Sequence, residues 1–403
     1  MKALFVSMSI ALAAFQPYTL RTFDGKTHDA EIATLGDLSV IRLRSTSPSP
    51  SSPIVFLSPG PGIASSVLGR VPVYFALFDK LRATSDVILL DARGEGMSKP
   101  NLDECPAAPL PDQPFESEAS LVKAMAASVK HCASYWRKKG VDLDAFTTDG
   151  RADDVERLRK ALGAERVNLL AFSYGTEVAR NLLRRYPQSI DRAVLAGTDE
   201  NPVPPSVFDA QLFKLGLADT ATKLLAQPRQ IIVDGHTYRV GKAAMQLIMT
   251  TKLADSSAPS IIPKLADDTT LQPIVKSLVQ GLKNGMTLVG RAIDCTTPRG
   301  AVLESTSILG NARSFHLAPQ ICATFKAPAK LPPPLLSNAP VLFISGTLDA
   351  NAPPFVAERI RWGLPNAKHV VIDGGFHETL PRDDVQQLVV DWFKSGSSGA
   401  DKN

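Results

Sequence analysis

Ser173 is the residue whose surroundings most clearly indicate chemistry. It stands in Ala171-Phe172-Ser173-Tyr174-Gly175, between an apolar run over 167–172 and a helical pattern over 176–186. A serine between a buried strand and a helix sits on a sharp turn that exposes its hydroxyl, and small residues two positions before and after it let strand and helix approach closely. The backbone N–H of Tyr174 would point to where an oxyanion forms. The segment therefore predicts a nucleophile elbow, with alanine in place of the usual first glycine.

A serine hydroxyl needs a base that takes its proton, and the base needs an orienting acid. His377 lies in a glycine-rich loop directly after a strand predicted over 370–372, and Asp349 directly follows a strand predicted over 341–345. The carboxyl ends of parallel strands meet at one edge of a sheet, so both should lie near Ser173. The order serine, aspartate, histidine is that of the α/β-hydrolase fold. We therefore predict a triad in which His377 is the base and Asp349 orients its imidazole.

Other histidines and a second aspartate fit these roles less well. His369 begins the last predicted strand, at the opposite edge of the sheet, which predicts a structural role. Asp373 also follows a strand but is too close to His377 in sequence to reach its far nitrogen comfortably. The remaining histidines either fall in a helical insertion, where a contact with substrate is open to them, or precede the serine: His236, His316, His28 and His131.

The second oxyanion donor is expected in the loop after the first buried strand. That loop reads Ser58-Pro59-Gly60-Pro61-Gly62. Glycine permits the backbone angles that turn an N–H inward, whereas proline has no N–H to offer. Gly60 is therefore the best candidate beside Tyr174, and Gly62 the next. An ordinary Pro-Gly turn is the alternative.

The elements that must position these residues follow two patterns. The first 60 residues are strand-like, with short β-rich segments over 18–24, 30–35 and 38–44, and a Ser/Pro-rich stretch over 47–53 predicts an exposed loop. Apolar strands then alternate with helices, which indicates a parallel sheet covered on both faces. The predicted strands are 54–57, 86–90, 167–172, 193–195, 341–345 and 370–372, and the helices 71–82, 116–139, 153–162, 176–186, 355–362 and 385–394. Between 199 and 334 the pattern is mainly helical, with helices at 212–225, 242–253, 271–286 and 308–315 and a hairpin at 231–240.

One large domain with an insertion accounts for this order, because residues on both sides of the insertion supply one triad. We predict an α/β fold with a mostly parallel central sheet, helices on both faces and an inserted, mainly helical lid. The core comprises 15–199 plus 336–396, the lid 200–335, a signal peptide 1–14 and a disordered tail 397–403.

Composition and the N-terminus narrow the class of protein. The 403 residues are 44% hydrophobic and 21% charged, which excludes disorder as the dominant state. The net charge of +4 is spread without a basic stripe, so no nucleic-acid partner is expected. No apolar run approaches the about 20 residues of a membrane span. Met1 and Lys2 precede an apolar run over 3–15 that resembles a short secretory signal, with Ala11-Leu12-Ala13 as a cleavage site. A buried first strand or a misassigned start is the alternative.

The four cysteines form two pairs of equal sequence separation, Cys105 with Cys132 and Cys295 with Cys322. None lies in a CxxC or Cys/His cluster, so a zinc site is disfavoured. An even count favours disulfides in an exported protein. Four buried free thiols in a cytosolic protein are the alternative.

With these residues in place, the chain resembles the prolyl and tripeptidyl aminopeptidase branch of the α/β-hydrolases. The loop over 58–62 matches the family's Gly-Gly-Pro-Gly type, with Pro59 substituted. Asp91-Ala92-Arg93-Gly94-Glu95-Gly96-Met97-Ser98 matches its Asp-x-Arg-Gly-x-Gly-x-Ser segment in full. Asp153-Asp154 and 158–163 look like its helix before the nucleophile strand, and Ser173-Tyr174-Gly175-Thr176 looks like its elbow. The match covers nearly the whole core and is weak in the insertion.

The resemblance implies a helical lid over the triad, and the paired cysteines look like those of secreted members. In aminopeptidase members, acidic residues near the lid grip the free α-amino group of the substrate. Asp199 and Glu200 stand where the last strand before the insertion ends and are the candidates for that role here. A solvated loop pair or a helix cap is the alternative.

The sequence therefore predicts a secreted or periplasmic serine hydrolase that acts through an acyl-enzyme, as an aminopeptidase on a small-molecule or peptide substrate. The alternative is an esterase or amidase on small acyl substrates, since the triad is the same. A non-catalytic binding protein on a hydrolase scaffold is a third hypothesis, disfavoured by the intact set of Ser173, Asp349 and His377. This chemistry requires no metal and no organic cofactor.

Overall fold

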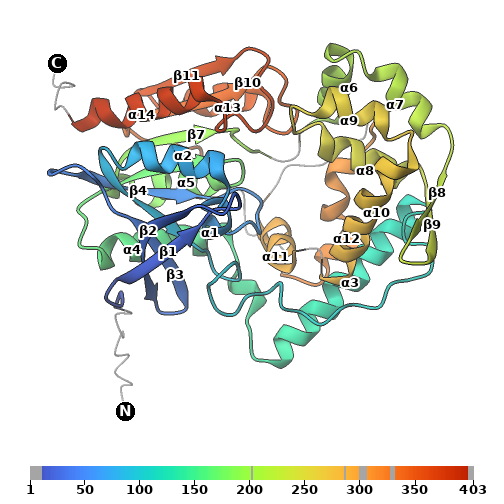
Figure 1. Ribbon diagram of the computed structural model, residues 1–403, viewed down its shortest axis with the longest axis horizontal. Helices are drawn as coiled ribbons and strands as arrows, with labels where there is room; N and C mark the ends of the chain where they lie inside the picture. The colour runs from blue at the N-terminus through green and yellow to red at the C-terminus, as the bar shows by residue number, and fades with distance from the viewer. Residues whose placement is uncertain (1–10, 201–202, 286, 299–305, 327–331, 398–403) are drawn as a thin grey trace.

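The computed structural model describes residues 11–200, 203–285, 287–298, 306–326 and 332–397. Within these residues a nine-stranded sheet crosses the core in the order β1-β2-β3-β5-β4-β6-β7-β10-β11 (Figure 1). β1, β2 and β3 pair antiparallel, β3 pairs antiparallel with β5, and the strands from β5 to β11 are parallel. The strands are β1 Gln16–Arg21, β2 Thr27–Leu35, β3 Leu38–Leu43, β4 Ser51–Leu57, β5 Ser85–Leu90, β6 Val167–Phe172, β7 Ile190–Ala196, β10 Val341–Gly346 and β11 Ala367–Ile372. The predicted mostly parallel sheet is confirmed.

Helices cover both faces of this sheet and create two separate apolar cores. Every residue of β6 and β10 is buried, because a parallel strand between two helical layers has no solvent face. One core lies under α2 (Pro72–Leu81) and α14 (Asp383–Ser397). The other lies under helices α3 Glu118–Lys138, α4 Thr148–Ala161, α5 Gly175–Arg185 and α13 Pro354–Arg361. Short α1 (Ser65–Leu68), η1 (Leu143–Ala145) and η2 (Pro187–Ser189) complete the core.

The chain between β7 and β10 forms a mainly helical layer, which we call the insertion. It gathers on the right of Figure 1, where α3, although it precedes the insertion in sequence, packs against α8, α10, α11 and α12. The predicted hairpin is confirmed, whereas helices α9, α11 and α12 were not predicted. Its elements are α6 Pro205–Lys214, α7 Ala218–Leu225, β8 Arg229–Val233, β9 His236–Val240, α8 Lys242–Lys252, α9 Ala258–Lys264, α10 Asp268–Lys283, α11 Leu288–Thr296, η3 Ala312–Leu317 and α12 Pro319–Cys322.

Three predicted boundaries are wrong for local reasons. The loop predicted through residue 53 is wrong at its end, because β4 begins at Ser51 and a register shift before Ile54 accommodates the proline. The single helix predicted over 212–225 is two helices, separated at Gly216, whose φ of 68° no helix can contain. Helix α4 begins five residues earlier than predicted, because the Thr147 hydroxyl caps it by accepting the Gly150 N–H at 3.0 Å.

The N-terminal prediction lies mostly outside the described residues, as does the tail after 397. Among the described residues of the predicted signal peptide, Leu12 forms a bridge to Leu35, and the Ala13 N–H donates to the Thr34 carbonyl at 2.8 Å. Cleavage after residue 14 would therefore remove two contacts with β2.

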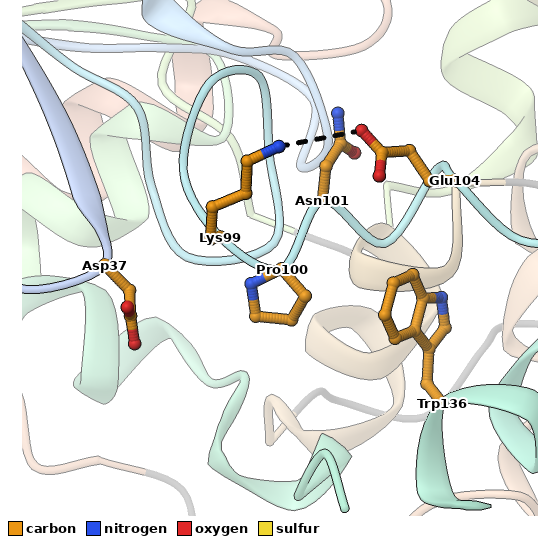
Figure 2. A pocket seen from close by; sticks show the side chains of 6 residues that line it. All are labelled: Asp37, Lys99, Pro100, Asn101, Glu104 and Trp136. Atoms are coloured by element: carbon orange, nitrogen blue, oxygen red, sulfur yellow. Dashed lines mark ion pairs between the residues drawn. The ribbon is translucent and has the colours of Figure 1, made fainter. Parts of the chain in front are cut away.

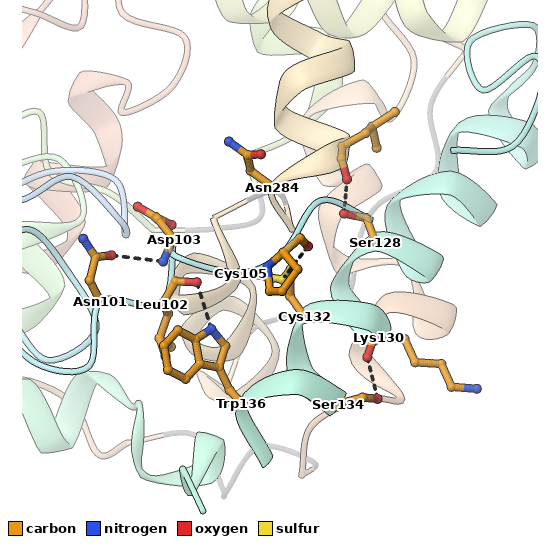
Figure 3. Close-up of a disulfide and its surroundings, with 12 residues drawn as sticks. Asn101, Leu102, Asp103, Cys105, Ser128, Lys130, Cys132, Ser134, Trp136 and Asn284 are labelled. Atoms are coloured by element: carbon orange, nitrogen blue, oxygen red, sulfur yellow. Dashed lines mark hydrogen bonds between the residues drawn. A yellow bond between two sulfur atoms is a disulfide. The ribbon is translucent and has the colours of Figure 1, made fainter. Parts of the chain in front are cut away.

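Both disulfides are present, so the alternative of four free thiols is wrong. Cys105–Cys132 joins the loop after β5 to α3, and Cys295–Cys322 joins α11 to α12. Figure 3 shows the first one beside the end of α10, where the Ser128 hydroxyl donates to the Leu282 carbonyl. The Cys105–Cys132 disulfide therefore lies where α3 of the core packs against α10 of the insertion.

Candidate active site

Ser173 occupies the turn between β6 and α5, in a backbone conformation that few non-glycine residues adopt. Its φ is 52°, and its N–H donates to the Ala196 carbonyl at 2.9 Å. A Cβ at Gly175 would collide with the backbone carbonyl of Leu57 at the end of β4. Only glycine therefore lets α5 begin this close to the sheet, and the serine is held at its carboxyl edge.

The structure brings Ser173, His377 and Asp349 into one chain of contacts. Ser173 Oγ lies 2.9 Å from His377 Nε2, and His377 Nδ1 lies 2.9 Å from Asp349 Oδ2. The three residues follow β6, β11 and β10, so they converge because the parallel strands end at the same edge. They are 7%, 8% and 4% exposed, which leaves them largely shielded from water. The spacing is that of a nucleophile, a base and an orienting acid.

Hydrogen bonds fix the Asp349 carboxylate in this position. Its Oδ1 accepts the N–H groups of Asn351 at 2.9 Å and Ala352 at 2.8 Å, so Oδ2 is left to face the imidazole. The imidazole packs 5.3 Å from the Phe172 ring, centroid to centroid, and a Cβ added at Gly197 would lie 3.1 Å from its Cε1 atom. The histidine therefore has little room to rotate.

The loop after β4 has the backbone that the oxyanion prediction needs. Gly60 and Gly62 have φ values of 125° and 114°, which exclude other residue types without strain. Tyr174 is 1% exposed, and its hydroxyl donates to Thr148 Oγ1 at 3.2 Å. Burial raises the pKa of the Tyr174 phenol, so its ring stays neutral and serves as packing. The role predicted for Tyr174 rests on its backbone N–H.

The two residues whose carboxylates were predicted to bind an amine have different surroundings in the structure. Glu200 forms an ion pair with Arg359 of α13, so it already has a cationic partner. Asp199 is 5% exposed; its N–H donates to Thr176 Oγ1 at 3.1 Å and its carbonyl accepts from Arg180 at 2.7 Å. Glu200 is therefore paired with a cation, whereas the printed bonds of Asp199 involve its backbone and its side chain is buried.

The insertion reaches the loops that carry Asp349 and His377. The His377 N–H donates to the Ala254 carbonyl at 3.2 Å, just after α8. Gln211 of α6, 3% exposed, donates through Nε2 to the carbonyls of Leu253 at 2.7 Å and Leu348 at 2.5 Å. No local pattern marks Gln211, because its partners lie 42 and 137 positions away along the chain.

Helix α11 of the insertion packs on the predicted oxyanion loop. Thr287, with φ 54°, lies so close to Gly62 that a Cβ on the glycine would be 3.2 Å from the Thr287 Cβ. A Cβ on Gly290 would lie 2.7 Å from the Pro61 carbonyl oxygen. Sequence reasoning missed both residues, since α11 starts without a side-chain cap.

The other histidines make contacts away from the triad. His369 lies 3.2 Å from a Glu358 oxygen and 3.1 Å from the Ser345 hydroxyl, as a structural role requires. His316 Nε2 is 3.6 Å from Asp294, inside the insertion.

A hollow of about 370 Å³, shown in Figure 2, is lined by residues other than Ser173, Asp349 and His377: Asp37, Lys99, Pro100, Asn101, Glu104 and Trp136.

Besides Asp349, a second carboxyl near His377 belongs to Glu378, the next residue in the chain. Burial, and after it the nearby Asp255, raise the pKa of the Glu378 carboxyl.

Among the residues that the structure describes, no three His, Cys, Asp or Glu side chains gather as a metal site would need. None of the described helices is long and apolar enough to cross a membrane.

Two protein-family models match this chain, one in its first part and one in its last part. A family model described as alpha/beta hydrolase fold matches residues 53–226, and one described as TAP-like protein matches 310–403. Serine protease Hip1 of Mycobacterium tuberculosis (strain ATCC 25618 / H37Rv) is 27% identical over 186 residues, which cover 44% of this chain and 34% of that protein. Hip1 of Mycobacterium bovis (strain ATCC BAA-935 / AF2122/97) gives the same figures. The match thus spans about a third of the length of these curated relatives.

Solved structures are similar at lower identity. A thermophilic esterase from Thermogutta terrifontis is 16% identical, with a TM-score of 0.43, and the alignment covers 94% of this chain and 99% of that one. With both family models matched and the sheet in place, the chain belongs to the α/β-hydrolases, in the TAP-like family.

Proposed function

We propose that this protein is a serine hydrolase that acts through an acyl-enzyme, with Ser173 as nucleophile, His377 as base and Asp349 as orienting acid. The observation that carries the proposal is the unbroken contact chain from Ser173 Oγ through the imidazole to the Asp349 carboxylate, with both contacts 2.9 Å long. Three residues from separate strands meet in this order, and each is largely buried.

The geometry supports a two-step mechanism in which one proton shuttles through His377. As Ser173 Oγ attacks the carbonyl carbon of the substrate, Nε2 takes its proton, while the hydrogen bond from Nδ1–H to Asp349 stabilises the imidazolium. The N–H groups of Gly60 and Tyr174 receive the oxyanion. The imidazolium then protonates the leaving amine or alcohol, and the acyl group stays on Ser173. Water attacks the ester, gives a proton to His377, and releases the acid as Ser173 regains its hydroxyl hydrogen.

For the reaction, we propose an aminopeptidase that releases N-terminal residues or short peptides from a peptide substrate, with the insertion as the lid. The TAP-like match and the serine protease Hip1 support a peptide substrate. The Glu200–Arg359 ion pair is the specific observation that favours the alternative, an esterase or amidase on small acyl groups. A substrate ammonium would have to displace Arg359 before Glu200 could hold it, which leaves Asp199 as the remaining candidate for amine binding.

The first test is chemical labelling of the nucleophile. A fluorophosphonate probe should label Ser173 in the wild-type protein, and Ser173→Ala should lose labelling and at least about 10³-fold of the activity. Ser134→Ala, which removes an exposed serine on α3, is the matched control and should behave as wild type. An unlabelled Ser173 in folded wild-type protein would refute the enzymatic proposal.

A second test separates the two substrate classes. Aminoacyl anilides with free and with acetylated amines are compared with p-nitrophenyl acetate. An aminopeptidase should lose most of its kcat/KM when the amine is blocked, because the ammonium contact is lost. Equal rates on free and blocked anilides would support the esterase or amidase.

We also propose that the protein is secreted or periplasmic. Two disulfides support this, because they persist in oxidising compartments. Thiol titration under denaturing, non-reducing conditions should find no free thiol in protein recovered from its native compartment. Four free thiols would contradict export.

A further inference from the structure

A buried ion pair lies behind the elbow, between Glu95 and Arg151. Glu95 is 1% exposed and Arg151 is 4% exposed, and they form a direct salt bridge from the loop after β5 to α4. Removing two charges from water opposes folding unless other contacts compensate, so such a pair is weak evidence of a role in stability. A role for the pair must therefore be inferred from the groups that the two side chains contact.

On one side, Glu95 holds the guanidinium from the loop after β5. Its carboxylate pairs with Arg151, and its own N–H donates to the Ala92 carbonyl at 3.1 Å within that loop. The guanidinium is therefore held from outside its own helix.

On the other side, Arg151 holds the residue after the nucleophile. Its guanidinium lies 5.3 Å from the centre of the Tyr174 ring, a cation–π contact in a dry environment. The Tyr174 hydroxyl donates to Thr148, one helical turn before Arg151 on α4. Tyr174 supplies one of the two proposed oxyanion donors through its backbone N–H.

We propose that Glu95 and Arg151 are positioning residues that set the oxyanion donor of Tyr174, because the pair and Thr148 hold the Tyr174 side chain. The inference rests on the proposed serine-hydrolase function. Preorganised donors are among the largest contributions to acyl-transfer catalysis, and about 1 Å of misplacement costs on the order of 100-fold in rate. Because the pair contacts the Tyr174 ring, its loss should loosen this donor.

The same loop and helix provide a matched control, the Arg93–Asp154 pair. Arg93 donates from Nε and a terminal nitrogen to Asp154 at 2.8 Å and 2.7 Å. Its other bonds go to the carbonyls of Ala145 at 3.0 Å and Gly150 at 3.2 Å. This pair joins the loop to α4 as Glu95–Arg151 does, but through contacts with α4 and the turn before it.

The experiment compares Glu95→Gln/Arg151→Met, which removes both buried charges together, with Asp154→Asn. The readouts are kcat and KM on p-nitrophenyl acetate, the inhibition constant of phenylboronic acid, which forms a tetrahedral adduct with the serine, and Tm. We expect kcat/KM to fall about 10- to 100-fold and the boronate constant to rise by a similar factor, with KM changed less than about threefold. Asp154→Asn should lower Tm but leave the boronate constant within about threefold of wild type.

Four results bear on the inference or on the proposed function. A folded double variant with wild-type kcat/KM and boronate binding overturns it, and so does an equal loss of boronate binding in Asp154→Asn. If the double variant does not fold, Arg151→Lys keeps the charge but loses the planar fork over the ring; an intermediate loss in both readouts supports the inference, and wild-type values overturn it. A wild-type protein that neither hydrolyses the ester nor reacts with a fluorophosphonate refutes the proposed function itself, which is a different outcome.

Discussion

Replacing Gly197 by alanine should disturb the proposed base without removing any catalytic group. Gly197 follows β7 with a φ of 58°, and an added Cβ would lie 3.1 Å from Cε1 and 3.3 Å from Nδ1 of His377. Carbon atoms pack best at about 3.5–4.0 Å, so the imidazole must move by about 0.4 Å. At about 100-fold per Å of misplacement, kcat should fall about sixfold.

Gly374→Ala is the matched control because it imposes the same backbone strain with open space around the new methyl group. Gly374 has a φ of 63°, lies in the same loop as His377, and a Cβ there would meet nothing within 4 Å. Both variants should lose about 1–2 kcal/mol of unfolding free energy from the left-handed backbone. Only Gly197→Ala should also lose activity.

The assay is ester hydrolysis at saturating substrate, with urea unfolding on the same samples. A Gly197→Ala protein that keeps the kcat of Gly374→Ala would refute the contact argument. So would an equal loss of kcat in both variants, since strain alone would then explain it.

Three further predictions concern stability. The hydrogen bond from Arg361 lowers the pKa of Glu358 from 4.5 to about 2, so this carboxylate contributes stability above pH 4.5 and loses it as the pH falls toward 2. Glu358→Gln should therefore lower Tm at pH 6, and the difference from wild type should shrink steadily below pH 4.5; a constant difference down to pH 3 would contradict this. Gln211→Leu should cost about 1–3 kcal/mol, because it leaves buried carbonyls such as that of Leu348 without a donor; urea unfolding measures the loss, and a neutral effect would show that water replaces the amide. Alanine at both cysteines of either disulfide should cost about 3.5 kcal/mol in the chain-entropy model, and equally for both because each spans 27 positions; values that differ by more than about 2 kcal/mol would mean that folded-state contacts dominate.

The positions of the proposed catalytic residues were predictable because local rules converge there. An apolar segment interrupted only by Asn168 marks β6, and its predicted bounds agree with the structure. The residues after β6, β10 and β11 then had to meet, because parallel strands expose their carboxyl ends at one edge. Spacing along the chain was enough for this part of the fold.

What could not be predicted depends on contacts between distant segments. Glu95 and Arg151 are 56 positions apart, and nothing local marks either as buried. Glu200 and Arg359 are 159 positions apart, so the sequence left Glu200 free to bind an amine. The position of Thr287 against the oxyanion loop depends on how the whole insertion folds.

The predicted start of helix α4 was wrong for a different reason. The Thr147 cap is a standard signal, but Gly150 in the first turn weakens the helical pattern that should follow it. Tertiary packing of α4 against α5 outweighs that penalty. Propensity is a weak guide where burial decides.

The order of the sheet has a consequence for biosynthesis. Ser173 and His377 are 204 residues apart, and the strand that carries the histidine occupies the outer edge of the finished sheet. At translation rates of about 5–20 residues per second, the nucleophile leaves the ribosome about 10–40 s before its base. During that interval the nascent chain holds a serine without its proposed proton acceptor, so the order of the strands along the chain keeps the proposed hydrolase inactive until β11 and the loop after it have been synthesised.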